Sequence, residues 1–74
     1  MYIVVELQTN ADGVVGSLVY KYDSFNEAES KYHSILAAAA VSAMAVHACV
    51  IMTNTGTVVK SEFYRHEQEE PIAE

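Results

Sequence analysis

The side chains best suited to chemistry in this sequence gather over a short stretch. Ser30, Lys31, His33 and Ser34 bring two hydroxyls, an ammonium and an imidazole close together. Such donors are suited to holding a small anion. Glu27 precedes Lys31 by one helical turn, in the order that favours an ion pair, so a solvated surface pair is the simpler interpretation of those two residues.

A second group of similar character lies near the end of the chain. Tyr64, Arg65 and His66 add an aromatic ring, a guanidinium and another imidazole. Pockets between subunits are common binding sites. If Ser30, Lys31, His33 and Ser34 are repeated around a symmetric interface, we expect both groups to contribute to one anion-binding pocket.

Other site chemistries find little support. His33, His47 and His66 have no partner at metal-ligand spacing, so we expect surface or edge positions and no metal. We find no serine or cysteine nucleophile motif and no phosphate-binding glycine loop, which predicts a protein that is not an enzyme and has no cofactor. Cys49 lies in an apolar segment, where we expect a buried, reduced thiol.

Charge and hydropathy narrow the range of partners. The net charge is −6, but Glu67, Glu69, Glu70 and Glu74 carry much of it, so residues 1–66 are nearly neutral. Four basic residues are too few for a phosphate-binding surface, which argues against nucleic acid. The apolar run over 35–50 is shorter than the ~20 residues that span a bilayer. No signal peptide is evident. We therefore expect a cytoplasmic protein that binds neither nucleic acid nor membrane.

The elements that position these residues follow from periodicity and turn chemistry. A capping box at Ser24 and Glu27 starts a helix that we expect to run to Ala43 or Ala45. Strand-like segments lie on either side, and residues 67–74 have the composition of a disordered acidic tail. The prediction is one ββαββ domain over residues 1–66, with strands over 2–9, 14–22, 46–53 and 57–66.

The fold class expected from this order is α+β. The first and third strands are the most apolar, so we place them at the centre of a four-stranded antiparallel sheet of order 2-1-3-4, with the helix on one face. Neither central strand has a clearly polar side, although a sheet covered by one helix should expose one face to water. A second copy of the chain is expected to cover that face.

The outer side of the helix also predicts self-association. Small residues recur there at a spacing that lets two helices pack closely, and charges are absent from its second half. Good helix propensity alone would explain the alanines, but it would not explain Val41 and Met44 beside them. We expect a homo-oligomer, either a dimer or a dimer of dimers. The expected interface is formed by Ser30, Ser34, Ala37, Ala38, Val41, Met44 and Ala45.

Several segments also carry a resemblance. Asn10-Ala11-Asp12-Gly13, the stretch 28–33, the stretch 36–42 and Val46-His47-Ala48 resemble a family of short uncharacterised proteins of Clostridia-like Gram-positive bacteria and their phages and prophages. The resemblance implies a mobile-element setting. Small phage proteins of this kind often look like anti-defence factors that either trap nucleotide immune signals or inhibit a host effector.

Three functions stay open at this point. The first is a non-enzymatic homo-oligomer that binds a small anionic ligand, such as a nucleotide-derived immune signal, and acts as a sponge. The second is an inhibitor or adaptor that binds a host protein through a sheet edge, an apolar surface or the acidic tail. The third is an assembly module without a ligand.

Overall fold

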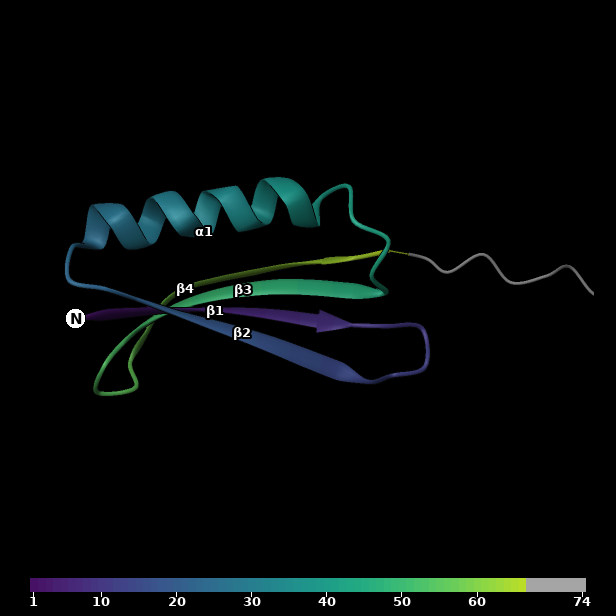
Figure 1. Ribbon diagram of the computed structural model, residues 1–74, viewed down its shortest axis with the longest axis horizontal. Helices are drawn as coiled ribbons and strands as arrows, with labels where there is room; N and C mark the ends of the chain where they lie inside the picture. The colour runs from purple at the N-terminus through teal and green to yellow at the C-terminus, as the bar shows by residue number, and fades with distance from the viewer. Residues whose placement is uncertain (67–74) are drawn as a thin grey trace, which may run out of the picture.

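The computed structural model describes residues 1–66 and contains five elements. The strands form one antiparallel sheet in the order β2-β1-β3-β4, and the helix lies along one face (Figure 1). This confirms the predicted α+β class and strand order. The predicted tail, 67–74, lies outside the described residues. The elements are β1 (Tyr2–Thr9), β2 (Val15–Tyr22), α1 (Phe25–Ala39), β3 (Val46–Thr53) and β4 (Val58–Arg65).

Both hairpin turns form in the short gaps between the predicted strands, after residues 9 and 53. Gly13 has φ +85° and Gly56 has φ +94°, a left-handed conformation that strains other residues. In the first turn, the Asn10 side-chain oxygen accepts hydrogen bonds from the backbone N–H groups of Asp12 and Val14, at 2.9 and 3.0 Å. This Asx-type arrangement sets the direction in which β2 returns along β1.

The helix begins as predicted but ends early. Ser24 is the extended N-cap residue, yet its side chain makes no capping hydrogen bond, so the predicted capping box is wrong in that respect. The helix ends at Ala39, and the prediction that it continues to Ala43 or Ala45 is also wrong. Contacts with the sheet compete with helix continuation here. The Ala39 carbonyl accepts a hydrogen bond from His66 Nε2 at 2.7 Å, and Ser42 lies 2.9 Å from the His47 ring.

This early end changes the predicted helical interface. Ser30, Ser34, Ala37 and Ala38 are exposed on α1, as a stripe on its outer side requires. Val41, Met44 and Ala45 instead lie in the connection to β3, so their predicted place on that stripe is wrong. Val41 is 86% exposed, whereas Met44 and Ala45 are half-buried.

The core lies between α1 and the two central strands. Ala28, Tyr32 and Ile35 of the helix pack against Val4, Cys49 and Ile51 of the sheet. The predicted burial of Cys49 is confirmed. Burial raises the pKa of its thiol to about 11, so the group stays protonated at neutral pH.

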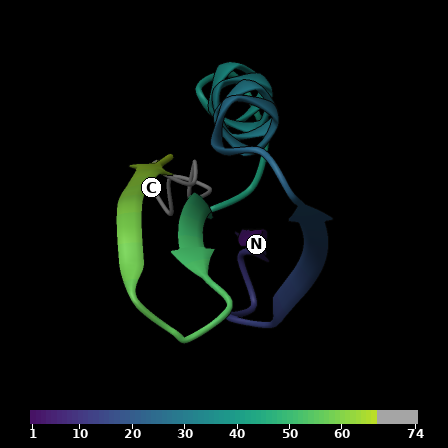
Figure 2. The ribbon, with the colours of Figure 1, turned by 90° about the vertical axis from the view of Figure 1, so that its left-hand side faces the viewer.

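The sheet has one covered face and one open face, because a single helix lies on one side of it (Figure 2). Side chains alternate between the two faces along each strand. Val4, Glu6, His47 and Cys49 point toward the helix and are buried. The central strands turn a different set of side chains toward the open face: Ile3, Val5, Leu7, Val46, Ala48, Val50 and Met52.

Candidate functional site

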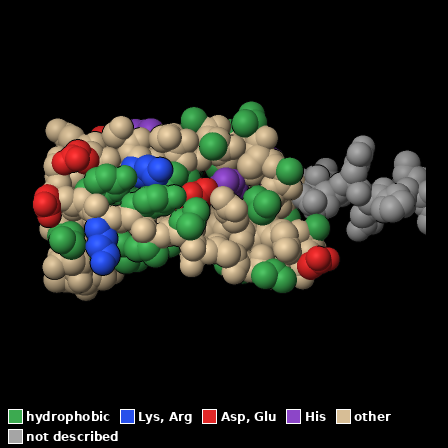
Figure 3. All heavy atoms as spheres, in the orientation of Figure 1, with side chains coloured by type: hydrophobic (Ala, Val, Ile, Leu, Met, Phe, Trp, Pro, Cys, Tyr) green, Lys and Arg blue, Asp and Glu red, His purple; other side chains and the backbone are tan. Residues whose placement is uncertain are grey.

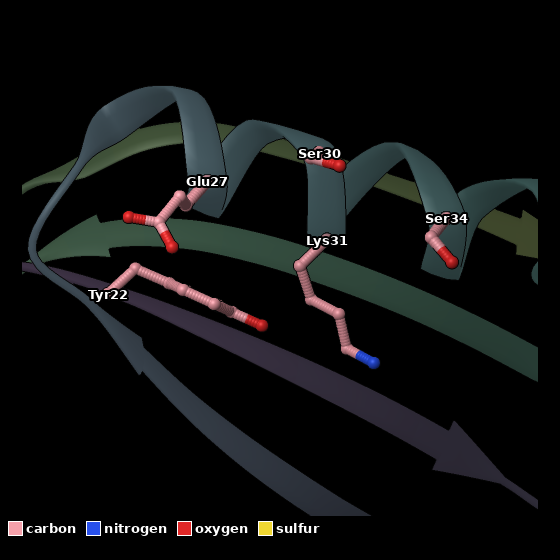
Figure 4. A pocket seen from close by; sticks show the side chains of 5 residues that line it. All are labelled: Tyr22, Glu27, Ser30, Lys31 and Ser34. Carbon is pink, nitrogen blue, oxygen red and sulfur yellow. The ribbon is translucent and has the colours of Figure 1, made fainter.

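A pocket of about 350 Å³ lies between the first half of α1 and the end of β2 (Figure 4). A volume of this order falls within the range of small-molecule sites. The pocket is a hollow that is largely open to solvent, so a small ligand could reach its lining. Its lining consists of Tyr22, Glu27, Ser30, Lys31 and Ser34.

Helical geometry explains why these side chains meet. Ala28 and Ile35 mark the side of α1 that is buried on the sheet. At 100° per residue, Glu27, Lys31 and Ser34 all fall on one flank of that side. This flank overhangs β2, whose last residue, Tyr22, pairs with Tyr2 and shares its face of the sheet.

Lys31 is the cation of the pocket, and its ammonium contacts one aromatic ring. Its Nζ atom lies 4.3 Å from the centroid of the Tyr20 ring, within the range of a cation–π contact. It also contributes to lowering the pKa of Glu6, which places its charge near that buried carboxylate. The ammonium is therefore positioned beneath the helix, where an anion entering the pocket would meet it.

The pocket has charges of both signs. Figure 4 shows the Glu27 carboxylate near the backbone end of Tyr22 and the Lys31 ammonium beyond the phenol oxygen of the same residue. A ligand with an anionic group at one end and hydrogen-bond donors at the other would match both. The Ser30 and Ser34 hydroxyls can donate or accept, so they add adaptable polar contacts.

Only part of the predicted ligand set comes together. Ser30, Lys31 and Ser34 line the pocket, whereas His33 is exposed on the helix and contacts the Tyr32 ring edge-to-face at 5.6 Å. Arg65 pairs with Val46 and lies on the open face of the sheet. Within one copy of the chain, the two predicted groups are separate.

Tyr64 and His66 also lie away from the pocket, at the end of β4 on the opposite edge of the sheet. Their rings stack with centroids 6.4 Å apart. The His66 backbone N–H donates to the Ala45 carbonyl at 2.8 Å, and its Nε2 donates to the Ala39 carbonyl. These contacts join the end of the sheet to the end of the helix.

Sequence reasoning missed a buried polar network on the covered face. His47 Nε2 lies 2.6 Å from a Glu6 carboxylate oxygen, and the Gln8 side-chain amide donates to the same oxygen at 2.9 Å. His47 is 4% exposed, so the prediction of a surface or edge position is wrong for this residue. Figure 3 shows Lys or Arg, acidic and histidine side chains close together in the middle of the face that carries the groove between helix and sheet.

The network extends to the connection after the helix. Ser42 Oγ lies 2.9 Å from His47 Nδ1 and accepts the Met44 backbone N–H at 3.3 Å. With His47 neutral, Nε2–H donates to Glu6 and the Ser42 hydroxyl donates to Nδ1. This arrangement gives both ring nitrogens a partner and joins the connection after α1 to the sheet.

Hydrogen bonding decides the ionisation of Glu6. Burial raises the pKa of this carboxyl group, but hydrogen bonds from Gln8 and His47 outweigh burial and bring the pKa below its ordinary value of 4.5. Glu6 is therefore a carboxylate at neutral pH. A signal was available in the sequence, because the alternation that buries Val4 places Glu6 on the same face.

Three further findings concern metal binding, membrane spans and similarity to known proteins. Over residues 1–66, no three histidine, cysteine, aspartate or glutamate side chains are grouped so that they could hold a metal ion. Within the same range, no helix has the length and hydropathy needed to cross a membrane. Comparisons with family models, curated proteins and solved structures yield no match to the chain.

Proposed function

We propose that this protein is a non-enzymatic binding protein that takes a small anionic molecule into the pocket between α1 and β2. The observation that supports this best is the placement of Lys31 in a pocket of about 350 Å³ whose lining also includes Ser30 and Ser34. A charge-assisted hydrogen bond from an ammonium to a phosphate is stronger than a neutral one, so Lys31 supplies the anchoring contact.

The composition of the pocket favours a nucleotide-derived ligand over a simple anion. An ionised Glu27 carboxylate can only accept hydrogen bonds, so it would repel a bare phosphate and attract the amino or imino groups of a base. Tyr22 offers a ring surface between the two charges. A phosphate near Lys31 and a base near Glu27 would use each lining group according to its chemistry.

The cellular role in this proposal is sequestration. The resemblance to proteins of Gram-positive bacteria and their phages and prophages supports an accessory protein that acts in the cytoplasm as a homo-oligomer. It would trap a nucleotide-derived immune signal without breaking it down. Sequestration needs affinity and copy number but no catalytic groups.

Paired lysine variants test the proposal. Isothermal titration is carried out with inorganic pyrophosphate, AMP, ADP-ribose and a cyclic dinucleotide as probes. Lys31→Met should weaken binding of the best probe about 10- to 100-fold, as expected for a lost charged hydrogen bond. Lys60→Met is the control. It removes an equal charge from β4, where Lys60 pairs with Glu29 of the helix, and should change the affinity less than about twofold.

The outcomes separate the alternatives. Equal losses from both variants would indicate general electrostatic attraction and would contradict a site at Lys31. No heat and no rise in melting temperature with any probe at millimolar concentration would overturn the ligand proposal, because a ligand stabilises the state it binds. A host-protein inhibitor or a ligand-free assembly module would then account better for the protein.

A further inference from the structure

The open face of the sheet is apolar at its centre and over part of each edge strand. At its centre, Val5 of β1 is paired with Val50 of β3, and both are only half-buried. At its edges, Val19 of β2 is 56% exposed and Phe63 of β4 is 58% exposed. A sheet face meant for water should carry polar side chains at these positions. An apolar patch this continuous marks an interaction surface.

The size of this face is adequate for a stable contact. Four strands about 4.8 Å apart and eight residues long, at about 3.3 Å per residue, give a flat area of roughly 400 to 500 Å². The accessible surface of protruding side chains exceeds the flat area. The flat area alone is therefore at least about half of the ~800 Å² that each partner contributes to a standard interface.

The charges of the open face are placed at diagonal corners. Lys21 on β2 pairs with Ile3, near the start of β1, and Arg65 on β4 pairs with Val46, near the other end of the sheet. β2 and β4 are the two edge strands, so these cations are as far apart as the sheet allows. The centre of the face is left without charge, as in the buried core of an interface.

We propose that this face binds the same face of a second copy of the chain, forming a two-layer dimer with both helices outside. The first support is that a twofold axis in the plane of the sheet, along or across the strands, keeps like charges apart. With the axis along the strands, Lys21 would lie over Val58 of the other copy and Arg65 over its Val15. With the axis across the strands, Lys21 would lie over Val15 and Arg65 over Val58.

The side-chain sizes give the second support. Ser17 lies in the same row across the strands as Phe63, at the opposite edge of the sheet, and Ser61 lies two residues from Phe63 on β4. Under the first axis, Phe63 would lie over Ser17 of the other copy, and under the second axis over its Ser61. Either way the largest side chain of the face meets the smallest polar one. Such self-complementarity is what an isologous interface requires.

Neighbouring residues on one strand provide the test. Val19 and Leu18 are 56% and 51% exposed and point to opposite faces of β2. Val19→Glu would bury a charge in the proposed dimer, whereas Leu18→Glu would not. Sedimentation at tens of micromolar should give the wild type and Leu18→Glu about twice the chain mass of 8.1 kDa, and Val19→Glu the mass of one chain. Far-UV circular dichroism checks that each variant folds.

Further variants make the result decisive. Phe63→Glu should also dissociate the dimer, and it replaces Val19→Glu if that variant fails to fold. A monomeric wild type would overturn the proposal. So would an Ala38→Glu variant that dissociates the protein while Val19→Glu does not, because the contact would then lie on the outer side of the helix. None of these substitutions replaces a residue that lines the Lys31 pocket, so a failure here leaves the ligand proposal intact.

Discussion

The network of Glu6, His47 and Ser42 shows most clearly, residue by residue, where sequence reasoning stops. Each polar side chain alone is ambiguous, since glutamate and histidine are usually found on surfaces. Alternation places both residues on the buried face, but their direct contact depends on β1 and β3 being neighbours in a particular register. Gln8 and Ser42 then complete the set, and no local pattern predicts their hydrogen bonds.

Replacing Glu6 with glutamine tests this network by its pH dependence. The folded-state pKa of Glu6 is lowered below 4.5, so the carboxylate contributes stability above that pH and loses it as the pH falls through the folded-state pKa. We expect Glu6→Gln to cost about 1.5 to 3 kcal/mol near pH 7, the range for a hydrogen bond to a charged group. The difference from wild type should shrink below about pH 4.5.

Urea unfolding at several pH values between 3 and 7 measures this difference directly. The slope m serves as the control, because an unchanged m shows that the variant unfolds from an equally compact state. If the free energies of unfolding of wild type and Glu6→Gln differ by the same amount at every pH down to 3, the carboxylate is no more stabilised in the folded state than in the unfolded one.

The predicted elements were mostly right in kind and less accurate at their ends. Turn chemistry at Asn10-Ala11-Asp12-Gly13 and at Gly56 is local, so the sequence suffices to place both hairpins. The helix end is different. Alanines favour continuation beyond Ala39, and nothing nearby in the sequence stops them. At this end the Ala39 carbonyl accepts a hydrogen bond from His66, 27 residues away, a contact that no local pattern predicts.

His66→Ala tests the link between β4 and the helix end. The variant removes the donor to the Ala39 carbonyl and should cost about 0.5 to 1.5 kcal/mol of unfolding free energy, the usual net value of a hydrogen bond. The effect should also be local. The amides of Val41 and Ser42, which donate to the carbonyls of Ala38 and Ala39, should exchange with deuterium faster.

Tyr64→Ala is the matched control, because it removes the ring stacked on His66 and leaves the hydrogen bond to Ala39 in place. Its effect on exchange at Val41 and Ser42 should be smaller. If His66→Ala leaves both stability and exchange unchanged, the helix end is fixed by its own backbone and not by β4.

The whole molecule has two surfaces of different character on opposite sides of one sheet. The Lys31 pocket lies on the covered side and the apolar face on the other. Composition and the mixed character of β1 and β3 were enough to predict surplus apolar surface. Which surface carries it depends on the pairing register, and the end of α1 at Ala39 removes Val41, Met44 and Ala45 from the helical stripe. The proposed dimer therefore relies on the sheet.

If the two copies fold and pair as one unit, thermal stability must depend on protein concentration. Unfolding of a dimer to two chains gains about 1.4 kcal/mol of stability per tenfold rise in concentration, by mass action. For about 150 residues in total, that corresponds to a rise in Tm of roughly 3 to 6 °C per tenfold. Melts followed by circular dichroism from about 2 to 200 µM would span about two such steps. Val19→Glu should melt lower and at one temperature throughout. Superimposable wild-type melts would mean that each chain folds without its partner.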